Sequence, residues 1–126
     1  MKTLYLDLPQ ALEVARRLGF YVKDAGLLES ALARPRTSVF GEDAYVGIPL
    51  KAAAMMHSVI KNHPMIDGNK RTAWALFVVF IWHNGFKHTF NEDDGFDLVL
   101  GIAEDRYGLA EVAALIEPRL IDRLNK

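Results

Sequence analysis

The sequence contains no cysteine among its 126 residues. This absence excludes disulfide-bonded scaffolds, zinc sites built on thiolates and thiol catalysis. Neither sign of charge is in excess, because 15 Lys and Arg residues face 16 Asp and Glu residues. A broad basic face is therefore missing, and we expect no direct DNA binding. Any anion that this chain binds must be held by a local cluster of positive charge.

Long hydrophobic runs are missing as well. The longest apolar run extends from Trp74 to Trp82, about half of the roughly 18 to 20 residues that a helix needs to cross a bilayer. Asp7 and Pro9 interrupt the N-terminal stretch where a signal peptide has an apolar core. We therefore expect no membrane association and a cytoplasmic location. The apolar and charged fractions, 51% and 25%, predict one globular domain over residues 1–126.

The spacing of apolar residues predicts helices along most of the chain. One is expected over about 8–18, a second from a cap at Asp24 to a stop at Pro35, and a third from Pro49 to before Pro64. The next contains the apolar run and stops at Asn84-Gly85, and two more start near Asp93 and at Leu109. Residues 34–41 are predicted as a loop, and 87–90 as short and extended at best. The fold class expected is an all-α bundle around a central apolar helix.

The segment from His63 to Thr72, with the sequence HPMIDGNKRT, joins two of the predicted helices. Lys70 and Arg71 lie in the first turn of a helix, where the helix dipole disfavours each exposed cation by about 0.3 to 1 kcal/mol. A bound anion would compensate for this. Backbone N–H groups of residues 68–70, together with the two cationic side chains, are predicted to form a phosphate cradle that Gly68 lets a ligand approach closely.

His63 and Asp67 add further chemistry to this segment. A neutral imidazole at position 63 could accept the proton of an attacking hydroxyl. Asp67 could cap the following helix through its backbone N–H groups, or hold a Mg²⁺ ion that bridges phosphate oxygens. These groups together indicate phosphoryl or nucleotidyl transfer, in which a protein mainly positions groups and neutralises charge.

The segment resembles the Fic/Doc motif, His-x-Phe-x-Asp/Glu-Gly-Asn-Gly/Lys-Arg, which joins two helices of a compact helical domain. Residues 24–35, DAGLLESALARP, also resemble the early helix of Doc-type toxins. Fic enzymes usually carry glycine where this chain has Lys70 and a second arginine where it has Trp74, and Doc-type members resemble this chain at both positions. The resemblance implies a toxin of a toxin–antitoxin pair, which transfers the γ-phosphate of ATP to a threonine of elongation factor Tu and halts translation.

The resemblance also implies how the motif would work. The lysine at the glycine position would block the nucleotide pose that exposes the α-phosphate and leave an inverted pose that presents the γ-phosphate. The implied catalytic residues are His63 as general base, Asp67 as Mg²⁺ or positioning residue, Lys70 and Arg71. The implied phosphate- and nucleotide-binding residues are Gly68, Asn69, Lys70, Arg71 and Thr72.

Inhibition is expected to come from a separate antitoxin, with a C-terminal helix in a groove near the motif. Some relatives inhibit themselves with a Ser/Thr-x-x-x-Glu-Gly/Asn helix, but the nearest string here, Ser38 to Asp43, lies in the predicted loop and ends in the wrong residue. Met65 replaces the usual phenylalanine, one large apolar side chain for another. Ala75 and Lys61 stand where a well-known member has asparagine and arginine, so nucleotide contacts can differ in detail.

Other interpretations stay open at this point. The chain could be a Fic-type nucleotidyltransferase that attaches AMP or another NMP to a protein hydroxyl, or a catalytically silent module that binds an anion or a partner. The histidines lack the spacing of a zinc site. We expect His57 to be half-buried, and His83 and His88 to face water. The aromatic residues of 74–82 are expected in the core, not as a nucleobase site. Surface positions are expected for Arg34, Arg36 and Arg119, and a helix-capping role for the acidic run 92–94.

Overall fold

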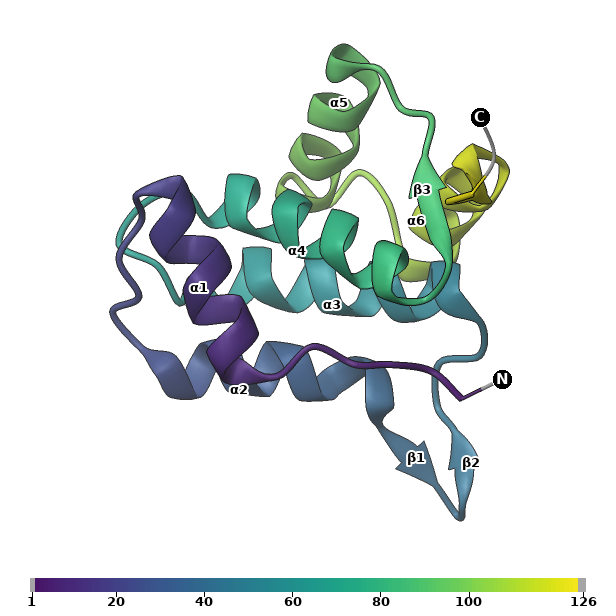
Figure 1. Cartoon of the computed structure of the whole chain (residues 1–126), viewed down its shortest axis with the longest axis horizontal. Helices are drawn as coiled ribbons and strands as arrows, with labels where there is room; N and C mark the ends of the chain where they lie inside the picture. Colours follow the sequence, from purple (N-terminus) through teal and green to yellow (C-terminus); the bar gives the residue numbers. More distant parts are fainter. Residues whose placement is uncertain (1, 125–126) are drawn as a thin grey trace.

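The structure, a computed structural model, describes residues 2–124. Over this range the chain forms six α-helices and two short antiparallel sheets (Figure 1). The helices are α1 (Leu8–Leu18), α2 (Ala25–Ala33), α3 (Ile48–Asn62), α4 (Asn69–His83), α5 (Glu92–Ala103) and α6 (Leu109–Ile116). The strands are β1 (Ser38–Val39), β2 (Glu42–Asp43), β3 (Phe86–His88) and β4 (Leu120–Asp122), and 3-10 turns cover Arg34–Arg36 and Glu117–Arg119. The expected all-α class is confirmed.

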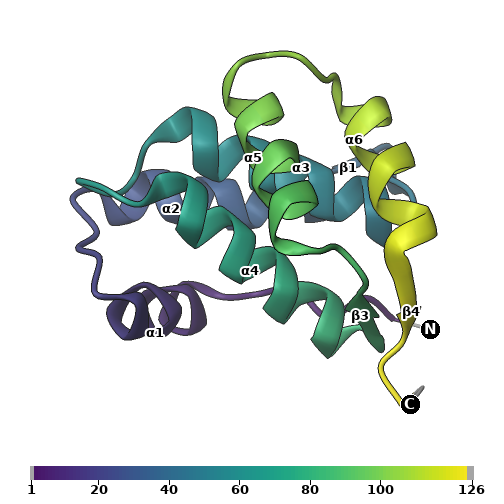
Figure 2. The ribbon, with the colours of Figure 1, turned by 90° about the horizontal axis from the view of Figure 1, so that it is seen from above.

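Helices α3 and α4 form the centre of the bundle. In Figure 1 they run beside each other, with α2 along the far side of α3 and α1 crossing one end of α4. Figure 2 shows α5 and α6 covering the remaining side. Helix α4 is apolar nearly all round because it packs against α1, α3, α5 and β3. Small residues of α3, the run Ala52–Ala54, are fully buried and let neighbouring helices approach its backbone.

Local signals fix the helix ends much as predicted. Asp7 caps α1 in a capping box with Gln10, and Gly19 ends that helix in the left-handed conformation. Asp24 caps α2 by accepting a hydrogen bond from the Leu27 N–H. The cap of α5, however, is Asn91 and not the acidic run at 92–94. Those three acidic residues occupy the first turn of α5, where the helix dipole favours negative charge.

The two small sheets are the main difference from the predicted secondary structure. Residues 34–41 are not a plain loop, because a 3-10 turn leads into the β1–β2 hairpin, in which Ser38 pairs with Asp43. Strand β3 pairs with β4 near the C-terminal end of the described chain. Strands of two or three residues are too short to show the alternating pattern by which a sequence reveals a strand.

Two polar networks attach the hairpin and the segments beside it to α3. Lys51 of α3 is only 2% exposed, and its ammonium group donates hydrogen bonds to Asp43, at 2.9 Å, and to the Tyr45 carbonyl. Arg34 was expected at the surface, but it is partly buried and donates to the Tyr45 hydroxyl and to the Ser58 hydroxyl, both at 3.0 Å. In each network a residue of α3, Lys51 or Ser58, bonds to a residue that precedes the helix in the chain.

No helix in the described part of the chain is long and apolar enough to span a membrane.

Candidate functional site

The loop between α3 and α4 carries the polar motif, and two left-handed residues bracket it. His63 ends α3 with φ 50° and ψ 55°, and Gly68 precedes α4 with φ 82° and ψ 24°. The α1–α2 connection holds this loop from outside: Val22 pairs with Met65, the Ile66 N–H donates to the Tyr21 carbonyl at 3.1 Å, and the Lys23 and Asp24 N–H groups donate to the Pro64 carbonyl. The loop is therefore fixed by backbone hydrogen bonds.

Asn69 links the loop to the imidazole of His63. Its carboxamide oxygen accepts from the Met65 N–H at 2.9 Å, and its nitrogen donates to the Met65 carbonyl at 3.2 Å. These two bonds fix the orientation of the amide, so the group that faces His63 is the NH₂ donor. It lies 3.4 Å from Nδ1 of His63. Since an amide NH₂ can only donate, the Nδ1 lone pair faces this NH₂ group.

Asp67 and Gly68 depart in part from the predicted cradle. The Gly68 N–H was expected to be free, but it donates to Oδ1 of Asp67 at 2.8 Å. Among residues 2–124, no side chain caps α4, and the N–H groups of residues 69–71 have no hydrogen-bond acceptor. The run of N–H groups without an acceptor therefore begins at residue 69, one residue later than predicted. Asp67 is not the cap of α4, the residue is exposed, and its second carboxylate oxygen has no hydrogen-bond partner among the described residues.

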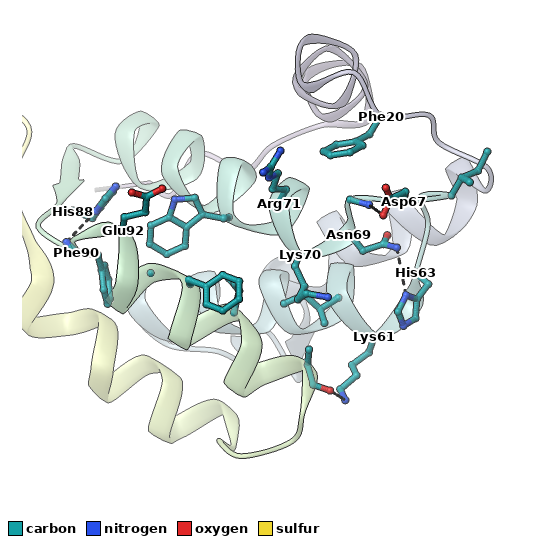
Figure 3. A pocket seen from close by; sticks show the side chains of 18 of the residues that line it. Phe20, Lys61, His63, Asp67, Asn69, Lys70, Arg71, His88, Phe90 and Glu92 are labelled. Atoms are coloured by element: carbon teal, nitrogen blue, oxygen red, sulfur yellow. Dashed lines mark hydrogen bonds between the residues drawn. The ribbon is translucent and has the colours of Figure 1, made fainter.

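Gly68 is required by the packing of the protein itself as well as by any ligand. A Cβ atom at this position would lie 2.5 Å from the ring of Phe20. Phe20 follows α1 and packs over the loop (Figure 3). We predicted a role for Gly68 in ligand approach but not this contact, because nothing in the sequence brings Phe20 to the loop.

A large open pocket of about 1060 Å³ lies along α4, between the motif and α5. Figure 3 shows His63, Asn69, Lys70 and Arg71 at one part of this pocket, with His88, Phe90 and Glu92 at the other. Six of the seven predicted site residues line it: His63, Asp67, Gly68, Asn69, Lys70 and Arg71. Lys70 and Arg71 are exposed, and neither forms an ion pair with any residue that the structure describes. Their charge is available for an anion.

Thr72 is the predicted binding residue that the structure does not bring to the pocket. Its side chain is fully buried, and its hydroxyl has no hydrogen-bond partner in the described part of the chain. Residue 72 follows the exposed first turn of α4 and faces inward, because three successive helical residues cannot all share one face. The Thr72 N–H donates to the Gly68 carbonyl within the helix.

Lys61 is a pocket residue for which sequence analysis predicted no structural role. Its ammonium group forms an ion pair with Oδ1 of Asp105 at 2.7 Å and donates to the Ala103 carbonyl at 3.1 Å. These bonds attach the C-terminal end of α5 beside His63, and the hydrogen bond and charge of Lys61 lower the pKa of Asp105. The partners lie 42 residues apart in the Lys61–Ala103 bond, so no local pattern could reveal them.

An aromatic group forms the far end of the pocket, where two expectations fail. Trp74 was expected in the core, yet it is half-buried and lines the pocket. His88 was expected to face water, yet its ring centroid lies 5.1 Å from that of Trp74, and its Nδ1 accepts from the Phe90 N–H at 3.1 Å. Burial lowers the pKa of His88. Trp82, also expected in the core, is 50% exposed.

His57 is half-buried, as predicted, and it belongs to the Arg34 network. Its Nδ1 lies 2.8 Å from a guanidinium nitrogen of Arg34. Burial, then the charges of Arg34 and Lys61, lower its pKa. Within residues 2–124, no cluster of three or more His, Asp or Glu side chains is arranged to hold a metal ion.

Comparison with known proteins places the site in a family. The model of the Fic/DOC family matches residues 3–81, which include the loop and nearly all of α4. The chain belongs to the Fic/DOC family. It is also 43% identical over 95 residues to "Toxin Doc" from Mycolicibacterium smegmatis (strain ATCC 700084 / mc(2)155), an alignment that covers 74% of this chain and 73% of that protein.

The Fic/DOC match and the pocket do not coincide completely. The polar end of the pocket, from His63 to Arg71, lies within the matched residues. The opposite wall, formed by β3, α5 and the residues between them, lies after residue 81 and outside the family match. The family therefore accounts for the polar end of the pocket, and the other wall must be interpreted from this chain's own residues.

Proposed function

We propose that this chain is a Doc-like toxin that transfers the γ-phosphate of ATP to a threonine hydroxyl of elongation factor Tu and thereby inhibits translation. The observation that carries the proposal is the concentration of unpaired positive charge at the start of α4. Two unpaired cationic side chains and three free N–H groups there face the same pocket as the exposed His63. The relative named "Toxin Doc" supports the toxin assignment.

The residues of the site suit each requirement of phosphoryl transfer. As the substrate oxygen bonds to the γ-phosphorus, its proton passes to the Nδ1 lone pair of His63, which gives up its 3.4 Å contact with the Asn69 NH₂ group. The bond between the γ-phosphorus and the β–γ bridging oxygen breaks, and ADP leaves with that oxygen. The N–H groups of residues 69–71 and the side chains of Lys70 and Arg71 hold the phosphate oxygens and stabilise the negative charge of the transition state.

Asp67 fits the role of a Mg²⁺ ligand. One of its oxygens accepts from the Gly68 N–H, the other has no partner among the described residues, and Asp67 lines the pocket. Mg²⁺ in phosphoryl-transfer sites is usually held by one or two carboxylates together with substrate phosphates. The ion would neutralise phosphate charge there, and Asp67 would be its protein ligand.

Transfer of label from ATP tests this function against its alternatives. With purified elongation factor Tu, label from the γ-phosphate should reach the protein, while label from the α-phosphate should stay in solution. Incorporation of the α-label would instead establish nucleotidyl transfer. His63→Ala should abolish transfer without unfolding the chain, because His63 is exposed. Toxicity that survives this substitution would favour a silent binding module.

The proposed toxin needs an inhibitor, and we propose a separate cognate antitoxin that places a C-terminal helix in a groove near the motif. The relative's name supports this assignment, and both proteins would act in the cytoplasm. Co-purification with the product of the neighbouring gene, and loss of toxicity when both are expressed, would support it. A product that neither binds nor protects would contradict it.

A further inference from the structure

We propose that the aromatic end of the pocket, formed by Trp74, His88 and Phe90, binds the base of the nucleotide. This inference rests on the proposed function and deepens it. The motif supplies groups for phosphate and for proton transfer, but it supplies none for the nucleoside half of the substrate. All three aromatic residues line the same pocket as Lys70 and Arg71, so one bound molecule can contact both ends.

The position of Trp74 on α4 suits a nucleotide that lies along the helix. Trp74 follows Lys70 by four residues and Arg71 by three, so the three side chains share one helical face. At 1.5 Å per residue, Trp74 lies about 7.5 Å along the axis from Asn69, where the cradle begins. Ribose and the inner phosphates would span this rise. A base at Trp74 would place the terminal phosphate beside His63, as transfer of the γ-phosphate requires.

The three rings form one group on the pocket wall. The Trp74 centroid lies 5.1 Å from that of His88 and 5.6 Å from that of Phe90, and the latter two are 5.9 Å apart. All three side chains stay partly exposed, whereas Phe77, which contacts the same group, is fully buried. Partly exposed rings beside a phosphate site offer the flat apolar surface on which bases stack.

Polar groups at this end complement the edge of a base. Because Nδ1 of His88 accepts from the Phe90 N–H, the neutral ring carries its proton on Nε2, and no residue in the described range accepts a hydrogen bond from that nitrogen. Glu92, on the same wall, presents an exposed carboxylate (Figure 3). One donor and one acceptor match the ring nitrogens and amino groups of a nucleobase.

Helix α5 holds the indole in place. A Cβ atom at Gly95 would lie 3.0 Å from two ring carbons of Trp74, so the backbone of α5 lies directly against the edge of the indole. A side chain that is already ordered loses little entropy when a ligand binds. The Trp74 side chain is therefore already ordered before a nucleotide binds.

The test compares two ligands that differ in the nucleoside. ATP carries base, ribose and triphosphate, whereas inorganic tripolyphosphate carries only the phosphates. Both are titrated, with Mg²⁺, by calorimetry into the wild-type chain, Trp74→Leu and a control, Trp82→Leu, which alters the other tryptophan, half-exposed and away from the pocket-lining residues. We expect Trp74→Leu to weaken ATP about five- to 100-fold, with tripolyphosphate unchanged, and Trp82→Leu to change neither.

A second measurement does not depend on the fold of the Trp74 variant. The chain has two tryptophans, so Trp82→Phe leaves Trp74 as the only one. Its emission should change on addition of ATP and stay constant with tripolyphosphate. Equal weakening of both ligands in Trp74→Leu, or ATP binding without any change in Trp74 emission, would overturn the inference and leave the proposed function standing. If neither ligand binds the wild-type chain, both proposals fail together.

Discussion

The carboxamide nitrogen of Asn69 lies 3.4 Å from Nδ1 of His63, and the same carboxamide bonds both backbone polar groups of Met65. One side chain at the start of α4 thus holds the loop and orients the imidazole at the end of α3. Figure 3 shows this contact as a dashed line between the two side chains.

Asn69→Ala removes the anchor of the loop. We expect transfer to fall about 10- to 100-fold, because a small displacement of a reacting group costs that much. The free energy of unfolding should fall by about 1 to 2 kcal/mol through lost hydrogen bonds. The matched control is Asn62→Ala, which loses a hydrogen bond to the Leu27 carbonyl outside the pocket. Steady-state kinetics and urea unfolding measure both effects, and wild-type kinetics for Asn69→Ala would contradict this role.

Gly68→Ala should be more costly than an ordinary left-handed glycine substitution. Any side chain at φ 82° is strained by about 1 to 2 kcal/mol, and the added Cβ would also displace the Phe20 ring. Gly19→Ala is the control, because Gly19 has φ 84° and nothing within 4 Å of the added atom. Urea unfolding should show a larger loss for Gly68→Ala. Equal losses would mean that Phe20 moves aside freely.

Thr72→Val tests whether residue 72 takes part in nucleotide binding. The substitution replaces a buried hydroxyl that has no partner among residues 2–124 with a methyl group. The free energy of unfolding should therefore stay constant or rise by about 1 kcal/mol. Because Thr72 does not line the pocket, ATP affinity should not change, and calorimetry checks this. Weakened ATP binding in a folded variant would restore Thr72 to the binding residues.

Stability should fall as the pH is lowered below neutrality. Burial lowers the pKa of His57 and of His88 beneath the ordinary value of 6.5. As the pH falls through that value, the unfolded chain takes up these protons before the folded chain does, so the unfolded state is favoured. Urea unfolding between pH 7.5 and 5.5, about one unit on each side of the ordinary pKa, should show the decline. His57→Gln and His88→Gln should each reduce the slope, and an unchanged slope in both would refute the assignment.

Sequence patterns were sufficient for features that depend on neighbours along the chain. Helical periodicity and the local cap Asp24 gave helix positions, and the motif brought six predicted residues to one pocket. The free N–H groups were predicted one residue too early, because the Gly68 N–H is taken by Asp67. That bond depends on a side-chain torsion, which spacing does not determine.

Contacts between distant segments were missed for a common reason. Lys61 and Ala103 are separated by 42 residues, and Arg34 and His57 by 23, so no spacing along one helix indicates that these residues meet. A lysine on a helix is normally expected at the surface. Lys51 is only 2% exposed, because other elements cover α3 on all sides. Burial of this kind depends on tertiary packing and leaves no mark in the local sequence.

Intact-mass spectrometry of elongation factor Tu, after incubation with this chain, Mg²⁺ and ATP, tests the central claim most directly. A Lys70→Gly variant is measured alongside, because this lysine is proposed to favour the pose that presents the γ-phosphate. We predict an increment of one phosphate with the native chain, located to a threonine by fragmentation. An increment of one nucleotide with the native chain, or no increment on any protein of a whole-cell lysate, would contradict it.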